Sequence, residues 1–439
     1  MSDAKTLFAI SGGGMVAVAV TAIGFGPLIP APYIGLSIVL LLLAAVSAWS
    51  LQAVRGMLLV PSPSIIAAST LLLSVGILSL FNSGISIDGL WGTGFEFGTF
   101  SSLVLFAAFS FVGSLLAPRS VRTLFYIYSI SVAGVASIWI VISLIGKATA
   151  GVPPELPVLL ASALGAALFI PRDGRANTIA HYLLSAILVA CLLLFFESVI
   201  AYSTICALAI VTGLRFVSFQ EAWTKLASIV AILVVLIFGL RAPFTLTQTV
   251  RPSLYTSAFV VDSAYQQGLV QALVGTGPST LQSGWERNRP NELNKTPYWN
   301  VPVDHLYSST ADIALTFGSL GLCAFLLFPA LLLARPREAG MKDGAEAVPS
   351  FLVLSLLLFV SALVYHISMP LLLIAALSAG IAAGSGSERT MLSTTTRRSV
   401  VIAASILGVV CLVAAVLQTV ATFERGRAET YSKADPGRS

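Results

Sequence analysis

A polar stretch of the chain meets a long apolar run at a point where three ionisable residues stand close together. The sequence "VDHLYSSTADIALTFGSLGLCAFLLF" carries Asp304 and His305 before the run and Asp312 inside it. Asp312 is two turns on from His305, so a helix starting here would present both on one face, with Asp304 capping its start. An imidazole can exchange a proton near neutral pH. The pattern predicts a water-filled cavity in which a proton can be transferred. For Asp312, the alternative is a structural hydrogen bond between helices.

Arginines stand near the same polar stretch. Arg241 ends the preceding apolar run, Arg251 opens the stretch, and Arg287 and Arg289 follow beside Trp285. A guanidinium binds phosphate oxygens through two parallel hydrogen bonds, so these arginines predict a site for a phosphate-bearing group. The alternatives are a snorkelling side chain for Arg241 and solvated charges for Arg287 and Arg289.

Three further polar residues stand at the ends of apolar runs. Glu197 could pair with one of the arginines or assist a proton transfer, and structural pairing is the more usual role of a lone acid in a span. His181 and His366 have no group of polar residues around them, which indicates a capping or interface role. The cysteines lie within apolar runs at a spacing that matches no metal site.

The composition decides what surrounds these residues. Of 439 residues, 57% are hydrophobic and only 10% are charged, which is too few to cover a soluble domain of this size. Apolar runs of about 20 residues recur, each long enough to cross a bilayer as a helix. We therefore expect an all-α polytopic membrane protein. The runs lie near 7–29, 33–54, 64–81, 99–117, 123–146, 155–171, 179–198, 201–217, 226–243, 306–334, 349–366, 369–385 and 399–422.

The predicted number of transmembrane helices is 12 or 13. Thirteen would place the C-terminal tail outside, whereas the basic residues of the tail favour the cytoplasm. Elsewhere, arginines and lysines fall in alternate connections, starting with Lys5 and Arg55. This bias puts the connection over 244–305 on the periplasmic side, and it accounts for the net charge of +5 without nucleic-acid binding.

Three parts follow from this pattern. We expect an N-terminal transmembrane bundle over 1–243, a long periplasmic loop over 244–305, and C-terminal transmembrane helices with a short tail over 306–439. Loops of this length are uncommon and are usually functional. The first half of the loop reads as an amphipathic helix on the membrane surface, and its "GTGP" predicts a tight turn that brings the backbone close to a ligand or to the membrane.

The layout resembles that of the O-antigen ligases and O-antigen (Wzy-type) polymerases of bacterial surface polysaccharide assembly. Four features carry the resemblance: the long periplasmic loop, Arg251 at its opening, "GTGP" in its second half, and His305 ahead of a helix with Gly318 and Gly321. It covers about 197–335, and elsewhere only apolar helices match.

The resemblance implies a GT-C-like fold and a glycosyltransferase that needs no metal and no other cofactor. A glycan on undecaprenyl diphosphate would pass to an acceptor hydroxyl at the periplasmic face of the bacterial inner membrane, among the membrane lipids. His305 would act as base or orienting group, and Arg251 would stabilise the charge that grows on the departing diphosphate. The residues expected to bind substrate are Arg241, Asp312, Glu197, Arg287 and Arg289.

Several classes of protein remain consistent with the sequence. A polymerase adds repeat units to a second lipid-linked glycan, whereas a ligase transfers the finished chain to lipid A core. The chain lacks the Ser-Arg that ligases carry near Glu197 and places His305 slightly further from Gly318, which favours a polymerase. A flippase for lipid-linked sugars would call for charged residues at mid-membrane depth along several helices.

Overall fold

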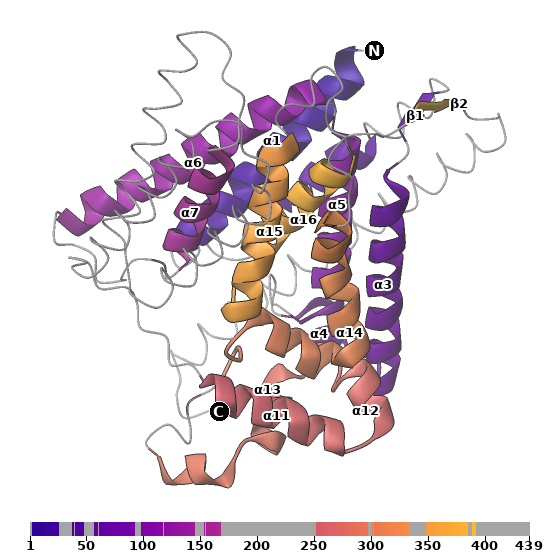
Figure 1. Cartoon of the computed structure of the whole chain (residues 1–439), viewed down its shortest axis with the longest axis vertical. Helices are drawn as coiled ribbons and strands as arrows, with labels where there is room; N and C mark the ends of the chain where they lie inside the picture. The colour runs from indigo at the N-terminus through magenta and orange to yellow at the C-terminus, as the bar shows by residue number, and fades with distance from the viewer. Residues whose placement is uncertain are drawn as a thin grey trace, which may run out of the picture.

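In the residues that the computed structural model describes, every element is a helix except for one two-stranded ribbon (Figure 1). The described residues are 2–25, 37, 38, 40–47, 57–59, 61–92, 98–116, 118–144, 153, 155–167, 252–296, 301, 303–333, 348–384 and 389–391. Their elements are α1 (Ser2–Phe25), β1 (Met57–Leu59), α3 (Pro63–Ser83), α4 (Ile87–Trp91), α5 (Phe100–Leu115), α6 (Pro118–Leu144), α7 (Leu156–Ala167), α11 (Leu254–Gln266), α12 (Leu269–Val274), α13 (Leu281–Asn288), the 3-10 helix η2 (Asn291–Lys295), α14 (Ser309–Leu333), α15 (Val348–Val364), α16 (Met369–Gly384) and β2 (Arg389–Met391).

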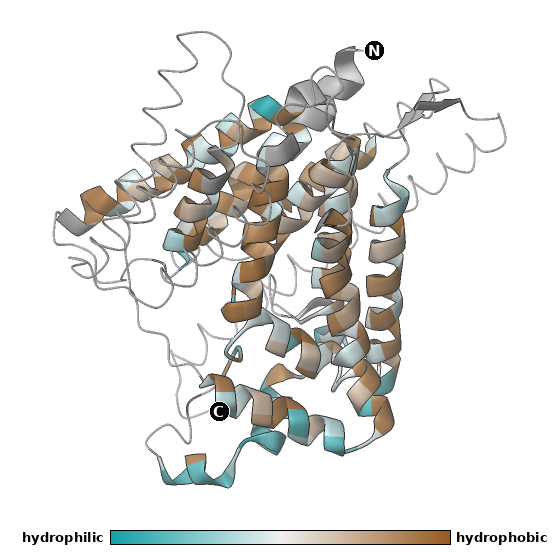
Figure 2. Cartoon of the chain, viewed as in Figure 1, coloured by the Kyte–Doolittle hydropathy of each residue, from teal (hydrophilic) through white to brown (hydrophobic). Residues whose placement is uncertain are grey.

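Apolar helices make up most of the described structure, as the brown ribbons of Figure 2 show. Among the described helices, those long and apolar enough to cross a membrane are Pro63–Ser83, Val121–Ile142 and Ser309–Leu332. Shorter apolar helices run over Ile10–Ile23, Phe100–Leu115, Ser350–Val364 and Met369–Gly384. The chain is thus an α-helical membrane protein. The spans predicted near 179–198, 201–217, 226–243 and 399–422, with part of 33–54, lie outside the described residues.

Helices α5 and α16 pack backbone against backbone. A Cβ atom at Gly113 would overlap the backbone of Leu377, and one at Gly380 or Gly384 would overlap the backbone around Ser110 or Ser114. Small residues at such spacing allow close helix contact in membranes, where van der Waals packing drives helix association. This contact fixes the second half of α16 against the end of α5.

The two ends of the bundle differ in character. β1 precedes α3, β2 follows α16, and the two strands pair antiparallel with Met57 opposite Met391. The ribbon therefore joins the chain before α3 to the chain after α16. Helices α11, α12 and α13 lie at the opposite end, below α3 and α14 in Figure 1, and carry much of the teal in Figure 2.

The chain from 252 to 308, which we call the polar segment, has a small core of its own. Ser253 starts α11, since its Oγ accepts a hydrogen bond from the backbone N–H of Thr256 at 3.1 Å. The amphipathic helix expected over this stretch is divided at Gly268 into α11 and α12. The buried apolar side chains that hold the polar segment against α14 are Val260, Ala264, Leu281, Trp285, Val303, Leu306 and Leu315.

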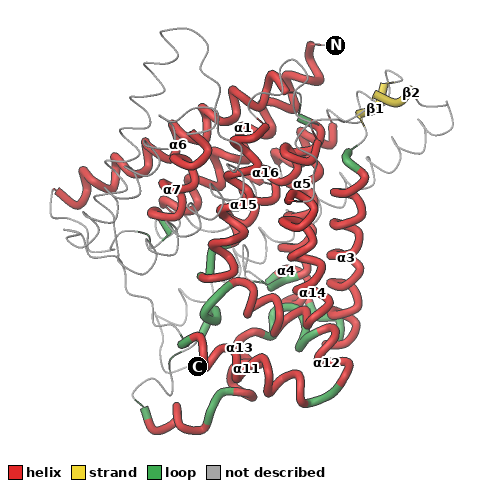
Figure 3. The backbone as a smooth tube through the Cα atoms, in the orientation of Figure 1, coloured by secondary structure: helices red, strands yellow, loops and turns green. Residues whose placement is uncertain are grey.

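Helix α14 is broken at Gly318, which has φ 68° and ψ −169°. The carbonyl oxygens of Leu315 and Thr316 accept hydrogen bonds from the backbone N–H groups of Thr276 and Gly277, at 2.9 and 3.0 Å. The break would otherwise leave polar backbone groups exposed to an apolar environment. The "GTGP" turn therefore does bring backbone into close approach, but the element it approaches is α14, and Figure 3 shows α12 against α14.

Candidate functional site

Asp312 lies in the first turn of α14 and is completely buried. Its Oδ1 atom accepts a hydrogen bond from the backbone N–H of Leu306 at 2.7 Å, and its Oδ2 atom lies 2.6 Å from Nδ1 of His366. A buried carboxylate needs such partners, because removing an unpaired charge from water costs several kcal/mol. Asp312 joins the start of α14 to the turn between α15 and α16.

The ring of His305 stacks on that of His366. The ring centroids are 4.4 Å apart and the ring planes differ by 23°. Two imidazoles and one carboxylate therefore meet at one point, although they come from separate parts of the chain. We refer to His305, Asp312 and His366 as the His–Asp cluster.

The structure corrects the expected geometry of His305. A helix beginning near 306 was expected to place His305 and Asp312 on one face, but α14 begins at Ser309. His305 precedes the helix and reaches Asp312 through the ring of His366. Asp304 is exposed and lies too far before the helix to cap it. Ser308 takes that role, since its Oγ accepts a hydrogen bond from the backbone N–H of Ala311 at 3.3 Å.

The sequence predicts no polar neighbours for His366, and this prediction is wrong, because both Asp312 and His305 contact it. It lies in the turn that joins α15 to α16, and its side chain is 15% exposed. The signal that could have found it is Asp312 itself. A carboxylate predicted within a span needs a polar partner, and His366 ends a span on the predicted outer side.

The turn that carries His366 is fixed by two further polar residues. Ser309 donates its Oγ–H to the carbonyl of Ile367 at 3.2 Å and accepts the N–H of Ile367 at 2.9 Å. Glu155, just before α7, accepts hydrogen bonds from the backbone N–H and the Oγ–H of Ser368, at 2.6 and 2.5 Å. No sequence pattern marks Glu155, because its partner Ser368 is remote in the chain.

The cluster lies at one end of the apolar helices. Helices α15 and α16 have 17 and 16 residues. At a rise of about 1.5 Å per residue, each is about 24–26 Å long, slightly less than the hydrocarbon core of a bilayer, which is about 30 Å thick. At the same end, Ser79 of α3 donates its Oγ–H to the backbone carbonyl of Thr316 at 3.0 Å. This end faces the polar segment, so the His–Asp cluster lies where apolar helices meet polar structure.

The polar segment borders the cluster from the other side. Trp285 of α13 packs in one buried group with Leu306, next to His305. On the same helix, Arg287 is exposed in the last turn and Arg289 forms the C-cap. The predicted residues Arg241, Arg251 and Glu197 lie outside the described residues.

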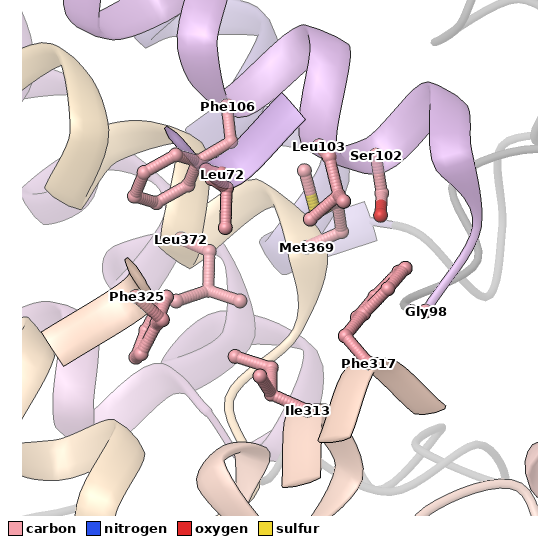
Figure 4. Close-up of a pocket in the computed structure, with 10 residues that line it drawn as sticks. All are labelled: Leu72, Gly98, Ser102, Leu103, Phe106, Ile313, Phe317, Phe325, Met369 and Leu372. Carbon is pink, nitrogen blue, oxygen red and sulfur yellow. The ribbon is translucent and has the colours of Figure 1, made fainter. Parts of the chain in front are cut away.

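An apolar pocket opens next to the cluster (Figure 4). Ile313, which follows Asp312, and Met369, at the start of α16, both line it. The pocket runs between helices α3, α5, α14 and α16, and its lining residues are Leu72, Gly98, Ser102, Leu103, Phe106, Ile313, Phe317, Phe325, Met369 and Leu372. The His–Asp cluster thus adjoins a small cavity lined almost entirely by apolar side chains.

No protein-family model matches the chain, and no curated protein shows significant sequence similarity to it.

Proposed function

We propose that the protein is a metal-independent glycosyltransferase of the bacterial inner membrane, with its site at the periplasmic face. It moves a glycan from undecaprenyl diphosphate to an acceptor hydroxyl and extends a surface polysaccharide in the manner of an O-antigen polymerase. One observation carries the proposal. A buried carboxylate, Asp312, is paired with His366, and the ring of His305 stacks on that of His366, where the apolar helices meet the polar segment.

The depth of the cluster suits an amphiphilic donor. The diphosphate of a polyprenyl lipid lies where hydrocarbon gives way to water, because its charge must remain hydrated while its chain stays among lipid tails. The His–Asp cluster lies at the corresponding end of the apolar helices. An acceptor hydroxyl approaching the anomeric carbon would then meet an imidazole.

The start of α11 lies beside the residues that follow His305. The backbone N–H of Tyr307 donates a hydrogen bond to Oγ of Ser257 at 3.0 Å. Arg251 opens the polar stretch in the sequence, and its proposed role is to bind the diphosphate. Arginines fixed in advance stabilise the negative charge that develops as the lipid diphosphate departs.

The remaining predicted residues have supporting roles. Arg241 is expected to provide a second contact to the diphosphate, and Arg287 and Arg289 border the glycan from α13. Glu197 is expected to pair with one of the arginines. Within the described residues, the His–Asp cluster lies at one end of the apolar helices, which favours an enzyme over a lipid-linked sugar flippase. A ligase acting on lipid A core shares the same donor chemistry.

The test is a transfer assay with purified protein, an undecaprenyl-diphosphate-linked repeat unit and alternative acceptors, with products separated by gel. A ladder of lengthening products supports a polymerase. Transfer of one glycan to lipid A core would replace the polymerase with a ligase. A protein that translocates the lipid-linked sugar across proteoliposomes and transfers nothing would be a flippase, and the glycosyltransferase proposal would be withdrawn.

A further inference from the structure

We propose that His366, rather than His305, takes the proton of the acceptor hydroxyl, and that Asp312 holds the ring of His366 and stabilises the charge it gains. This inference rests on the proposed glycosyl transfer and assigns the base within it. The sequence pattern favours His305 for this role, whereas the contacts of the His–Asp cluster favour His366.

The pairing with Asp312 sets which ring nitrogen of His366 can act. Nδ1 of His366 lies 2.6 Å from Oδ2 of Asp312, and an ionised carboxylate only accepts hydrogen bonds, so Nδ1 carries the hydrogen between them. Nε2 of His366 is then the atom that takes the proton of the acceptor hydroxyl. The carboxylate also stabilises the imidazolium that forms, as carboxylates do for paired histidines in other proton-transfer sites. With its side chain 15% exposed, His366 remains within reach of a bound acceptor.

His305 is less suited to hold a proton at the same time. Its ring is stacked 4.4 Å from that of His366, and two cationic rings at this distance would repel each other. Asp312 directs one oxygen to Leu306 and the other to His366. Asp312 thus stabilises a positive charge on His366, and we assign to His305 the orientation of the acceptor.

The turn around His366 is fixed on both sides, as a catalytic base requires. Ser309 binds both backbone groups of Ile367, and Glu155 binds Ser368 through two hydrogen bonds. A base must be held within a fraction of an ångström of its working geometry. Glu155 is thus a positioning residue, which acts on the reaction only through the turn.

The step balances with these groups alone. The acceptor oxygen forms a bond to the anomeric carbon of the glycan, and its proton moves to Nε2 of His366. The bond between the anomeric carbon and the diphosphate oxygen breaks, and its electron pair leaves with undecaprenyl diphosphate. The proton on His366 then passes to water or to the released diphosphate, which restores the neutral ring.

The test compares His366→Asn with His305→Asn in the full-length protein in nanodiscs. An asparagine amide can occupy the place of Nδ1 and keep the hydrogen bond to Asp312, so His366→Asn should fold normally yet take up no proton. We expect a fall in turnover of at least about 100-fold for His366→Asn. For His305→Asn we expect a fall of roughly 10-fold, the effect of one lost hydrogen bond. Val364→Ala, which changes a 43% exposed side chain at the end of α15, is the matched control.

A second readout separates a base from a residue that only supports the fold. An acceptor carrying fluorine next to the reacting hydroxyl is more acidic and depends less on a base. The defect of His366→Asn should shrink at least about 10-fold with this acceptor, whereas the defect of His305→Asn should not change. The defect of Glu155→Gln, which acts on positioning, should also be the same with both acceptors.

The possible outcomes separate this inference from the proposed function. Wild-type protein that transfers no glycan would overturn the proposed function. Wild-type protein that transfers glycan while His366→Asn keeps a rate within about threefold would overturn the assignment of the base and leave the transfer intact. A defect of His305→Asn that is larger, and is relieved by the acidic acceptor, would return the role of base to His305.

Discussion

Oδ2 of Asp312 and Nδ1 of His366 lie 2.6 Å apart although 54 residues separate them in the chain. The contact joins the start of α14 to the α15–α16 turn, and the ring of His305 stacks on that of His366. Asp312 is completely buried whereas His366 is partly exposed, so the contact lies at the boundary between the bundle and its surroundings. Its loss should affect both the fold and the chemistry.

Removing the carboxylate of Asp312 should destabilise the protein. In Asp312→Ala, the backbone N–H of Leu306 and Nδ1 of His366 would lose their buried acceptor, which we expect to cost about 3 kcal/mol. Thermal unfolding of the detergent-solubilised protein measures this loss. Asp304→Ala, at an exposed site nearby, is the control and should change stability by less than about 0.5 kcal/mol. Equal unfolding temperatures for the two variants would show that Asp312 does not hold α14 in place.

Sequence periodicity was sufficient for the apolar helices but not for their ends. The spans predicted near 64–81, 349–366 and 369–385 agree closely with α3, α15 and α16. The prediction failed at the start of α14, because 304–308 fold back when Leu306 binds the carboxylate of Asp312. The helix propensities of residues 304–308 do not depend on that contact and so cannot predict it.

The candidate site was only partly predictable for the same reason. His305 and Asp312 were found, because an acid in an apolar run is conspicuous. The role of His366 depends on the packing of α15 against α14, and that of Glu155 on the packing of α7 against the same turn. The break at Gly318 is likewise stabilised by Thr276 and Gly277, which local sequence around Gly318 does not show.

The close approach of the "GTGP" turn to α14 should make Gly275→Ala strongly destabilising. Gly275 has φ 79°, and an added Cβ would overlap the backbone of Thr316 and Gly318. The strained backbone and the overlap together should cost about 2–4 kcal/mol. Gly134→Ala is the control, because a Cβ there meets nothing within 4 Å. Unfolding temperature and membrane abundance measure the effect, and a stable Gly275→Ala protein would mean that the turn does not dock on α14.

The outer face of α12 should lie in lipid. Leu269, Val270 and Leu273 are 75%, 59% and 38% exposed, and Phe81 at the end of the membrane-spanning α3 is 66% exposed. An exposed apolar face beside a span is stable only where lipid covers it. A spin label at Val270→Cys, with the native cysteines replaced, should collide more often with oxygen than with a water-soluble nickel chelate. A label at Gln282→Cys, exposed on α13, should show the reverse. Preference for the chelate at Val270 would place α12 in water.

Tyr265 should titrate at unusually high pH. Burial, with a smaller contribution from the nearby Cys323 thiol, raises the pKa of Tyr265 from 10.0 to about 12. The folded protein therefore keeps a proton that the unfolded chain releases, so the associated stability is complete below pH about 10 and is lost as pH rises through about 12. Ultraviolet titration of wild type minus Tyr265→Phe should show one phenolate with a midpoint near pH 12. A midpoint near 10 would mean that Tyr265, which donates to the carbonyl of Ala314, is not held against α14.

Glycan transfer from an undecaprenyl-diphosphate-linked repeat unit, with released undecaprenyl diphosphate counted alongside, tests the central claim most directly. We expect the purified wild-type protein to form glycosylated product and lipid diphosphate in equal amounts. Arg251→Ala should lower the rate roughly 30- to 1000-fold, since a bidentate contact to a charged group contributes about 2–4 kcal/mol. Arg251→Lys should be nearly as slow, because lysine lacks the planar fork. Well-folded wild-type protein that releases no lipid diphosphate with any acceptor would contradict the claim that this membrane protein is a glycosyltransferase.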